Sequence, residues 1–289
     1  MRGGIAMMAC LRFWATLLCW LIPLLATAGD DKGIGRPLVF GLMPYLNTRT
    51  LMANYQPLAA SLEKELQTPL TLQTAPDFDT FVKRVFDGDY DLVLLAPHYA
   101  RLAEKEFGYV PLLVHKAPIR SLLVTARDKP LTSVAELRGQ TIAVVERSAL
   151  IAIVGAAWLA EEGLREGTDY RFVETVTHTS ALYNAATGKA RAAIVSHSTL
   201  ILAPQDLQRD VVIFREIAQI PGQFVLAHSR LSSERRQAVK AALLRFEKSA
   251  EGQLFFERTS HGGYREASRD DVQLLDRLLP ETRRQIGNL

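Results

Sequence analysis

The sequence is poor in cysteine: its 289 residues contain only Cys10 and Cys19, and both lie within the first 28 residues. If that segment is removed, the remaining 261 residues have no thiol. This excludes disulfide bonds and metal sites with cysteine ligands, so a hydrophobic core must provide the stability of the protein. The remaining length suits two domains of ordinary size or one large domain.

Other common features are also absent. No segment after residue 28 approaches the roughly 20 apolar residues that a transmembrane helix needs. No basic stripe with interleaved aromatic residues occurs, so we expect no nucleic-acid partner. The sequence contains no G-x-S-x-G, H-E-x-x-H, P-loop or G-x-G-x-x-G pattern after a strand, which argues against the common hydrolases, metalloproteases and nucleotide-binding enzymes. We therefore predict a protein that is not an enzyme and has neither a cofactor nor a metal site.

The first 28 residues have the pattern of a secretory signal peptide. Arg2 provides a positive charge, an apolar run covers about 13–25, and Ala26–Ala28 is a small-residue cleavage pattern. We predict cleavage near Ala28 and export of the protein, with a retained N-terminal anchor as the alternative. Loss of Arg2 and Arg12 lowers the formal net charge from +3 to +1.

Strand-like and helix-like segments alternate along the rest of the chain. Leu38–Leu42 and Asp91–Ala96 are short apolar runs of the kind that is buried in parallel sheets. Between them, apolar residues recur at spacings of three and four from Leu51 onward, which indicates an amphipathic helix. The alternation predicts an α/β protein with open, mostly parallel sheets flanked by helices. Further helices are predicted at about 78–86, 151–162, 181–187, 233–247 and 270–279.

Two polar, turn-rich stretches at 126–140 and 218–223 interrupt the series of apolar strands. Two such crossings indicate that a middle lobe is inserted into an outer lobe. We expect a two-lobed protein in which the outer lobe comprises 37–125 plus 223–289 and the inner lobe comprises 126–222. Two lobes that are joined by two crossings form a cleft that can close about a hinge.

Polar residues follow four of the predicted strands, at the sheet edges where open α/β folds bind ligands. Ser148 is the most informative, because a helix N-terminus offers unpaired N–H groups and a partial positive charge to an anion. A plain N-cap serine is the alternative. A nucleophile–base pair of Ser148 and His178 in a periplasmic hydrolase is a third possibility, although no acid is placed to orient the imidazole.

Several segments, taken in their order and spacing, resemble the periplasmic solute-binding proteins for phosphate, phosphite and phosphonate of ABC transporters. The resemblance extends over most of the chain after residue 28. The segments that carry it are LVFGLMPYLNTRTLMANYQPLAASLEKEL from Leu38, DGDYDLVLLAPHYA from Asp87, IRSLLVTARDKPLTSVAELRGQTIAVVERSA from Ile119, THTSALYNAATGKARAAIV from Thr177 and IPGQFVLAHSRLSSERR from Ile220.

This resemblance implies a type II periplasmic binding fold that captures a small oxyanion. It also implies that the ligand is delivered to an inner-membrane ABC permease, or alternatively that its binding is signalled to a membrane kinase, by a protein that works as a monomer. The binding residues that the resemblance and the strand ends suggest are Ser148, Ala149, Leu150, His178 and Thr179 from the inner lobe, with Tyr45, His98 and Tyr99 from the outer lobe.

The sequence departs from the family pattern at two places. The family loop usually reads Ser-Thr-Ser-Gly, whereas this chain has Ser148-Ala149-Leu150-Ile151, so hydroxyl donors are missing. Arg191 and His197 stand where acidic residues would bind the amine of an aminophosphonate, which argues against that ligand. An organic acid or a vitamin precursor is therefore an alternative ligand on the same fold.

Overall fold

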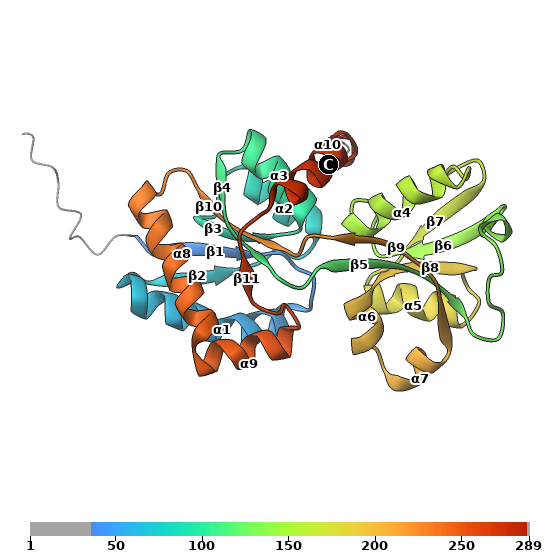
Figure 1. Cartoon of the computed structure of the whole chain (residues 1–289), viewed down its shortest axis with the longest axis horizontal. Helices are drawn as coiled ribbons and strands as arrows, with labels where there is room; N and C mark the ends of the chain where they lie inside the picture. The colour runs from blue at the N-terminus through green and yellow to red at the C-terminus, as the bar shows by residue number, and fades with distance from the viewer. Residues whose placement is uncertain (1–35, 288–289) are drawn as a thin grey trace, which may run out of the picture. The chain divides into compact units, whose positions relative to one another are not determined.

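The computed structural model describes residues 36–287, whose strands form two β-sheets (Figure 1). The predicted signal peptide lies outside the described residues. The first sheet has six strands in the order β11-β4-β10-β3-β1-β2, and the second has five in the order β7-β6-β8-β5-β9. In chain order the strands are β1 (Leu38–Leu42), β2 (Leu70–Gln73), β3 (Leu92–Leu95), β4 (Tyr109–His115), β5 (Ile119–Ala126), β6 (Gln140–Val144), β7 (Tyr170–Glu174), β8 (Ala192–Ser196), β9 (Val211–Ile220), β10 (Phe224–His228) and β11 (Tyr264–Arg265).

Helices connect most of these strands. They are α1 (Thr48–Leu66), α2 (Phe78–Phe86), α3 (Pro97–Glu106), the 3-10 helix η1 (Val134–Leu137), α4 (Leu150–Glu161), α5 (His178–Ala186), α6 (His197–Leu202), α7 (Gln205–Arg209), α8 (Ser233–Lys248), α9 (Ala250–Thr259) and α10 (Arg269–Ile286). None of the helices in residues 36–287 combines the length and the apolar character that crossing a membrane requires.

Each sheet has a parallel part made by strand–helix–strand units. In the first sheet β1 pairs in parallel with β2 and β3, and β10 runs antiparallel to β3 and β4. In the second sheet β6 pairs in parallel with β7 and β8, whereas β5 runs antiparallel to β8 and β9. Because β1 and β3 are parallel neighbours, their carboxyl ends open at the same edge of their sheet, and the same holds for β6 and β7.

The chain passes between the sheets twice, through 116–118 after β4 and through 221–223 before β10. The two passages are hydrogen-bonded together, because the His115 N–H donates to the Gln223 carbonyl at 2.9 Å. The first passage comes earlier than the sequence-based boundary at residue 125. That boundary assigned residues 119–125 to the outer lobe, whereas β5 pairs with β8 and β9 of the inner sheet. The error arises because the sequence analysis placed the crossing in the polar stretch 126–140, which follows β5, whereas the chain crosses before β5.

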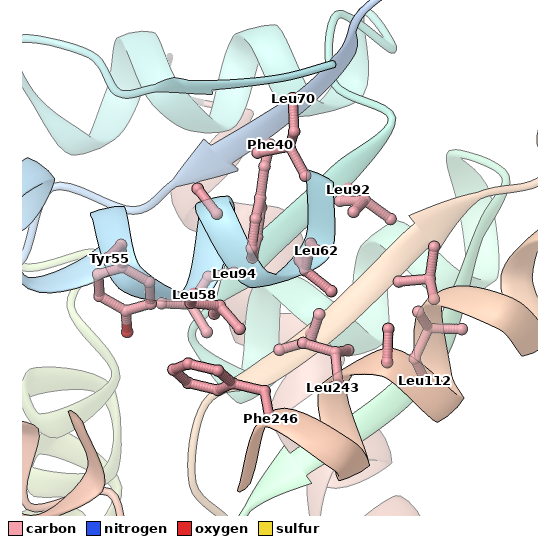
Figure 2. Packing of buried hydrophobic residues seen from close by; sticks show 14 of the residues in the cluster. Phe40, Tyr55, Leu58, Leu62, Leu70, Leu92, Leu94, Leu112, Leu243 and Phe246 are labelled. Carbon is pink, nitrogen blue, oxygen red and sulfur yellow. The ribbon is translucent and has the colours of Figure 1, made fainter. Parts of the chain in front are cut away.

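Buried apolar residues cover both faces of the six-stranded sheet. On one face, α1, α8 and α9 pack against the strands, with Phe40, Leu58 and Phe246 at the centre of the contact (Figure 2). On the other face, α2, α3 and α10 bury a second cluster that includes Phe81 and Tyr90. Burial of side chains of this size stabilises the fold by about 1.5–3 kcal/mol each relative to exposure.

The five-stranded sheet is covered by α4 on one face and by α5 on the other. Gly155 lets α4 approach the sheet closely, since a Cβ at this position would overlap the Ile194 side chain of β8. Leu150 and Val154 of α4 are buried in the same cluster as Phe81 and Tyr90 of the outer lobe. The first turns of α4 therefore contribute to the contact between the two lobes.

Candidate functional site

The predicted site residues lie after the carboxyl ends of parallel strands, as the sequence suggested. Tyr45 follows β1, His98 and Tyr99 begin α3 after β3, and Ser148 lies between β6 and α4. His178 and Thr179 begin α5 after β7. The structure brings some of these residues into contact with one another and gives others different neighbours.

The β6–α4 junction has no side-chain cap. The N-cap residue of α4 is Ala149 rather than Ser148, and it makes no side-chain hydrogen bond to the helix. The Ser148 hydroxyl donates to the Glu146 carboxyl group at 3.5 Å, which is a long hydrogen bond. The Ala149 N–H donates to the Glu146 carbonyl at 3.2 Å, so it is already in use. The first N–H groups of a helix have no partners within the helix. Because the Ala152 and Ile153 N–H groups donate to the Ala149 carbonyl, only the N–H groups of Leu150 and Ile151 remain at this helix start.

Three carboxylates surround this junction, and the sequence analysis did not identify them. Glu146 lies in the junction itself, Glu174 ends β7, and Asp79 lies in the first turn of α2 of the outer lobe. Burial, followed by the charge of Asp79, raises the pKa of Glu146 to about 7. Burial also raises the pKa of Asp79, and the charges of Asp77 and Glu174 add to that shift. A protonated Glu146 can donate a hydrogen bond, whereas an ionised one repels an anion at Ser148.

His98 and Tyr99 both donate hydrogen bonds to the Ser148 carbonyl across the lobe boundary. The Nε2 of His98 is 3.2 Å and the hydroxyl of Tyr99 is 3.3 Å from that oxygen. Because a carbonyl oxygen only accepts, Nε2 of His98 carries the proton. Burial lowers the pKa of His98 to about 3, although the bond to Ser148 opposes the shift. These two residues therefore hold the backbone of the junction, and their donors point at Ser148.

His178 is the first residue of α5, which begins three residues earlier than the sequence analysis predicted. The cap is Thr177, whose hydroxyl accepts a hydrogen bond from the Ser180 N–H at 3.0 Å. Burial lowers the pKa of His178 to about 4, so its ring is neutral near pH 7. Its Nδ1 is buried and has no hydrogen-bond partner among residues 36–287. Thr179 lines a shallow hollow that is closed on its other side by Asp206 and Leu207.

Tyr45 belongs to a polar cluster that sequence analysis could not find. Its hydroxyl lies 3.3 Å from the Tyr55 hydroxyl and 3.2 Å from the Nε2 of His261. Burial raises the pKa of Tyr45 to about 12, while the Tyr55 hydrogen bond opposes this shift. Tyr45 and His261 are 216 residues apart in the chain, and no local pattern links residues at that separation.

The chain is similar to a known family of binding proteins. The model of the periplasmic substrate-binding proteins of ABC phosphonate transporters matches residues 40–272. The chain belongs to this family. The phosphonate-binding family and its two-lobed type II fold were both predicted from the sequence, and both predictions are confirmed. No curated protein sequence matches the chain.

Solved structures resemble this phosphonate-family binding protein in fold. A binding protein of an ABC phosphonate transporter from Pseudomonas aeruginosa, PA3383, superposes with a TM-score of 0.72 at 13% identity, covering 87% of this chain and 98% of that one. PhnD1 from Prochlorococcus marinus, in complex with methylphosphonate, has the same values. XAC2383 from Xanthomonas citri, bound to ATP, has a TM-score of 0.71 at 17% identity and covers 87% and 98%.

Ser148 has a different hydrogen-bond partner from the one that the hydrolase alternative requires. The Ser148 hydroxyl contacts Glu146, and no hydrogen bond joins it to His178 within the described chain. A nucleophilic serine needs a base within hydrogen-bonding distance, so the hydrolase alternative gains no support here. Among residues 36–287, no group of three or more histidine, aspartate or glutamate side chains is arranged to hold a metal ion.

Proposed function

We propose that this family member binds a small phosphorus oxyanion, such as phosphonate, phosphite or phosphate, at the β6–α4 junction. The N–H groups of Leu150 and Ile151 and the His178 ring contribute donors from the inner lobe, and the Ser148 hydroxyl joins them by turning its proton from Glu146 to the ligand. Tyr45 donates from the outer lobe, and His98 and Tyr99 hold the Ser148 backbone. The observation that carries the proposal is the absence of a side-chain cap on α4, which leaves its first donors for a ligand.

The proposal includes a transport role in the periplasm. After removal of the segment that ends near Ala28, the protein would work as a monomer that delivers its ligand to an inner-membrane ABC permease. The family to which the chain belongs supports this role, since its members are the periplasmic components of such transporters. Neither a metal nor a cofactor has a part in it.

The carboxylates near the β6–α4 junction narrow the charge that we expect on the ligand. Two charges 4 Å apart near a protein surface interact with an energy of about 4 kcal/mol, so an ionised Asp79 or Glu146 would disfavour a doubly charged anion. We therefore expect a preference for a singly charged anion. A ligand with an ammonium group would also be favoured by these carboxylates. Arg191 does not oppose such a ligand as the sequence suggested, because it precedes β8 at the other edge of the sheet and pairs with Glu136. His197 follows β8 at the carboxyl edge.

A thermal-shift screen of residues 29–289 tests the proposal. Phosphate, phosphite, methylphosphonate, aminoethylphosphonate and a panel of carboxylates are the ligands. A ligand at 100 times its Kd stabilises the folded state by about 2.7 kcal/mol, which corresponds to several degrees of Tm. We expect a shift only with the phosphorus compounds. A shift only with a carboxylate would replace the proposed ligand class by an organic acid.

A further inference from the structure

The cluster of Tyr45, Tyr55 and His261 lies in the outer lobe and joins three separate parts of the chain. Tyr45 lies between β1 and α1, Tyr55 lies within α1, and His261 lies between α9 and β11. The Tyr55 hydroxyl is 3.2 Å from Nε2 of His261 and 3.3 Å from the Tyr45 hydroxyl. The side chain of Tyr55 is fully buried, whereas Tyr45 is only partly buried. Of the two tyrosines, only Tyr45 can therefore also reach a ligand.

The surroundings of His261 hold its ring in place and keep it neutral. The ring stacks on His115 with a centroid distance of 4.0 Å and an interplanar angle of 16°. The edge of Phe255 packs on another side, at 6.5 Å between centroids. Burial lowers the pKa of His261 to about 4, and burial and His261 lower the pKa of His115 well below its usual range. A neutral imidazole carries one proton, on either Nε2 or Nδ1.

The hydrogen bonds available to the cluster limit where each proton can go. Tyr55 has only two partners within the described chain, the Tyr45 oxygen and Nε2 of His261. If Nε2 carries the proton, the Tyr55 hydroxyl has to donate to the Tyr45 oxygen. The Tyr45 proton then finds no acceptor inside the cluster and points outward. If Nε2 is bare, it can accept the Tyr45 proton, and the Tyr45 hydroxyl would then present only lone pairs to a ligand.

We propose that His261 is a positioning residue that carries its proton on Nε2 and thereby makes Tyr45 an outward hydrogen-bond donor. The bonds run from His261 to Tyr55, from Tyr55 to Tyr45 and from Tyr45 to a ligand oxygen. His115 contributes by fixing the plane of the His261 ring. The inference rests on the proposed function, because only an anionic ligand requires Tyr45 to donate. His261, which does not lie at a strand end, would thus favour ligands with a negatively charged oxygen at Tyr45.

The first test needs no ligand. Long-range ¹H–¹⁵N correlation spectra of residues 29–289 report which imidazole nitrogen is protonated in each histidine, and the His261→Phe spectrum assigns the His261 signals by their loss. We expect a neutral His261 with a protonated Nε2 at pH 7. A bare Nε2 would overturn the proposal. This result stands whether or not the protein binds phosphorus oxyanions, so it separates failure of the proposal from failure of the proposed function.

The second test is a double-mutant cycle on the affinity for methylphosphonate, measured by isothermal titration calorimetry. His261→Phe keeps the ring stack on His115 but removes the donor, and we expect it to raise Kd about tenfold. In a Tyr45→Phe background the same substitution should change Kd less than about twofold, because the hydroxyl that it orients is absent. An equal loss in both backgrounds would show that His261 acts only on the fold and would overturn the proposal.

Two further variants control this cycle. His261→Gln retains an N–H donor, and we expect it to recover Kd to within about threefold of the wild type. His115→Phe keeps an aromatic ring against His261 and should leave Kd nearly unchanged. Calorimetric Tm values establish that each variant is folded. Recovery of Kd in His261→Gln would show that His261 acts through its hydrogen bond rather than through packing. If His261→Gln does not recover Kd while His115→Phe binds normally, the proposal is overturned.

Discussion

Two strand-to-helix junctions meet at the lobe boundary, and their surroundings differ. The β3–α3 junction, with His98 and Tyr99, is almost wholly buried and aromatic, and Pro97 occupies the first helical turn. The β6–α4 junction, with Glu146 and Ser148, is half-exposed and charged. Neither helix has a side-chain cap, so the two junctions differ in burial and charge rather than in capping. We infer that the β3–α3 junction provides rigid support and that the β6–α4 junction presents the ligand-binding groups. Changes to the first should affect stability, and changes to the second should affect affinity.

The largest expected effect is on the supporting junction. His98→Ala removes a fully buried ring and its hydrogen bond to Ser148, and we expect a loss of about 3 kcal/mol in the free energy of unfolding. Urea denaturation of residues 29–289 measures this loss. His178→Ala is the matched control from the other lobe, where we expect less than about 1 kcal/mol because the ring is only partly buried. Equal losses would remove the distinction between the two sides.

A double substitution on the ligand side should have an effect of similar size, but on binding. Ser148→Ala combined with His178→Ala removes two donors to a charged ligand, and we expect Kd for methylphosphonate to rise about 100-fold or more. Calorimetric titration measures Kd, and the Tm without ligand should stay within a few degrees of the wild type. Unchanged affinity in a folded double variant would show that the anion binds elsewhere.

Tyr99→Phe sharpens the comparison within the supporting junction. The substitution removes one of two hydrogen bonds to the Ser148 carbonyl, and the expected cost is about 1 kcal/mol in the free energy of unfolding. Kd should change by less than about threefold, because the hydroxyl points at the backbone rather than at the ligand. Denaturation and calorimetric titration of the same preparation separate these effects. A loss of affinity without a loss of stability would mean that Tyr99 contacts the ligand directly.

Glu146 introduces a pH dependence into both stability and affinity. Its pKa is raised from 4.5 to about 7, so the folded state binds more protons than the unfolded state between these values. Stability should therefore fall as pH rises from about 4.5 to about 7. Affinity for the anion should also fall as pH rises through about 7, because the carboxylate becomes charged.

Glu146→Gln provides the control for this dependence. The amide has a similar shape but does not titrate, so the stability slope between pH 4.5 and 7 should flatten relative to the wild type. Changes in the charge of the ligand affect both proteins equally, and the difference between them isolates Glu146. Identical pH profiles for wild type and variant would show that Glu146 titrates near its usual pKa.

Local patterns predicted many of the elements. The helix at 78–86 coincides with α2, and the helix expected at 151–162 differs from α4 by one residue at each end. Both succeeded because apolar residues recur at helical spacing, or fill the helix throughout, between clear polar boundaries. In contrast, α3 was not predicted, and His98 and Tyr99 were interpreted only as polar residues at a strand end. Pro97 lies in the first turn of α3, a position that tolerates proline. Helix α9 was also missed, because Gly252 interrupts its first turn.

The candidate site likewise has features that the sequence predicted and features that it did not. Sequence order and spacing indicated that Ser148, His178 and Tyr45 follow strand ends, and parallel strands open at one edge of a sheet for general geometric reasons. Side-chain partners depend on folding instead. The pKa of Glu146 is raised by burial and by the charge of Asp79, which lies near Glu146 only when the two lobes come together. No spacing rule describes such contacts.

The family, the α/β class, the two lobes and the strand ends with polar residues could all be predicted from the sequence alone. These features depend on local apolar periodicity and on the order of segments along the chain, which a linear sequence displays directly. In contrast, long-range packing places β5 in the inner sheet, Ala149 rather than Ser148 at the N-cap position of α4, and His261 against Tyr45. Those features depend on contacts between residues far apart in the chain, and packing in three dimensions selects them.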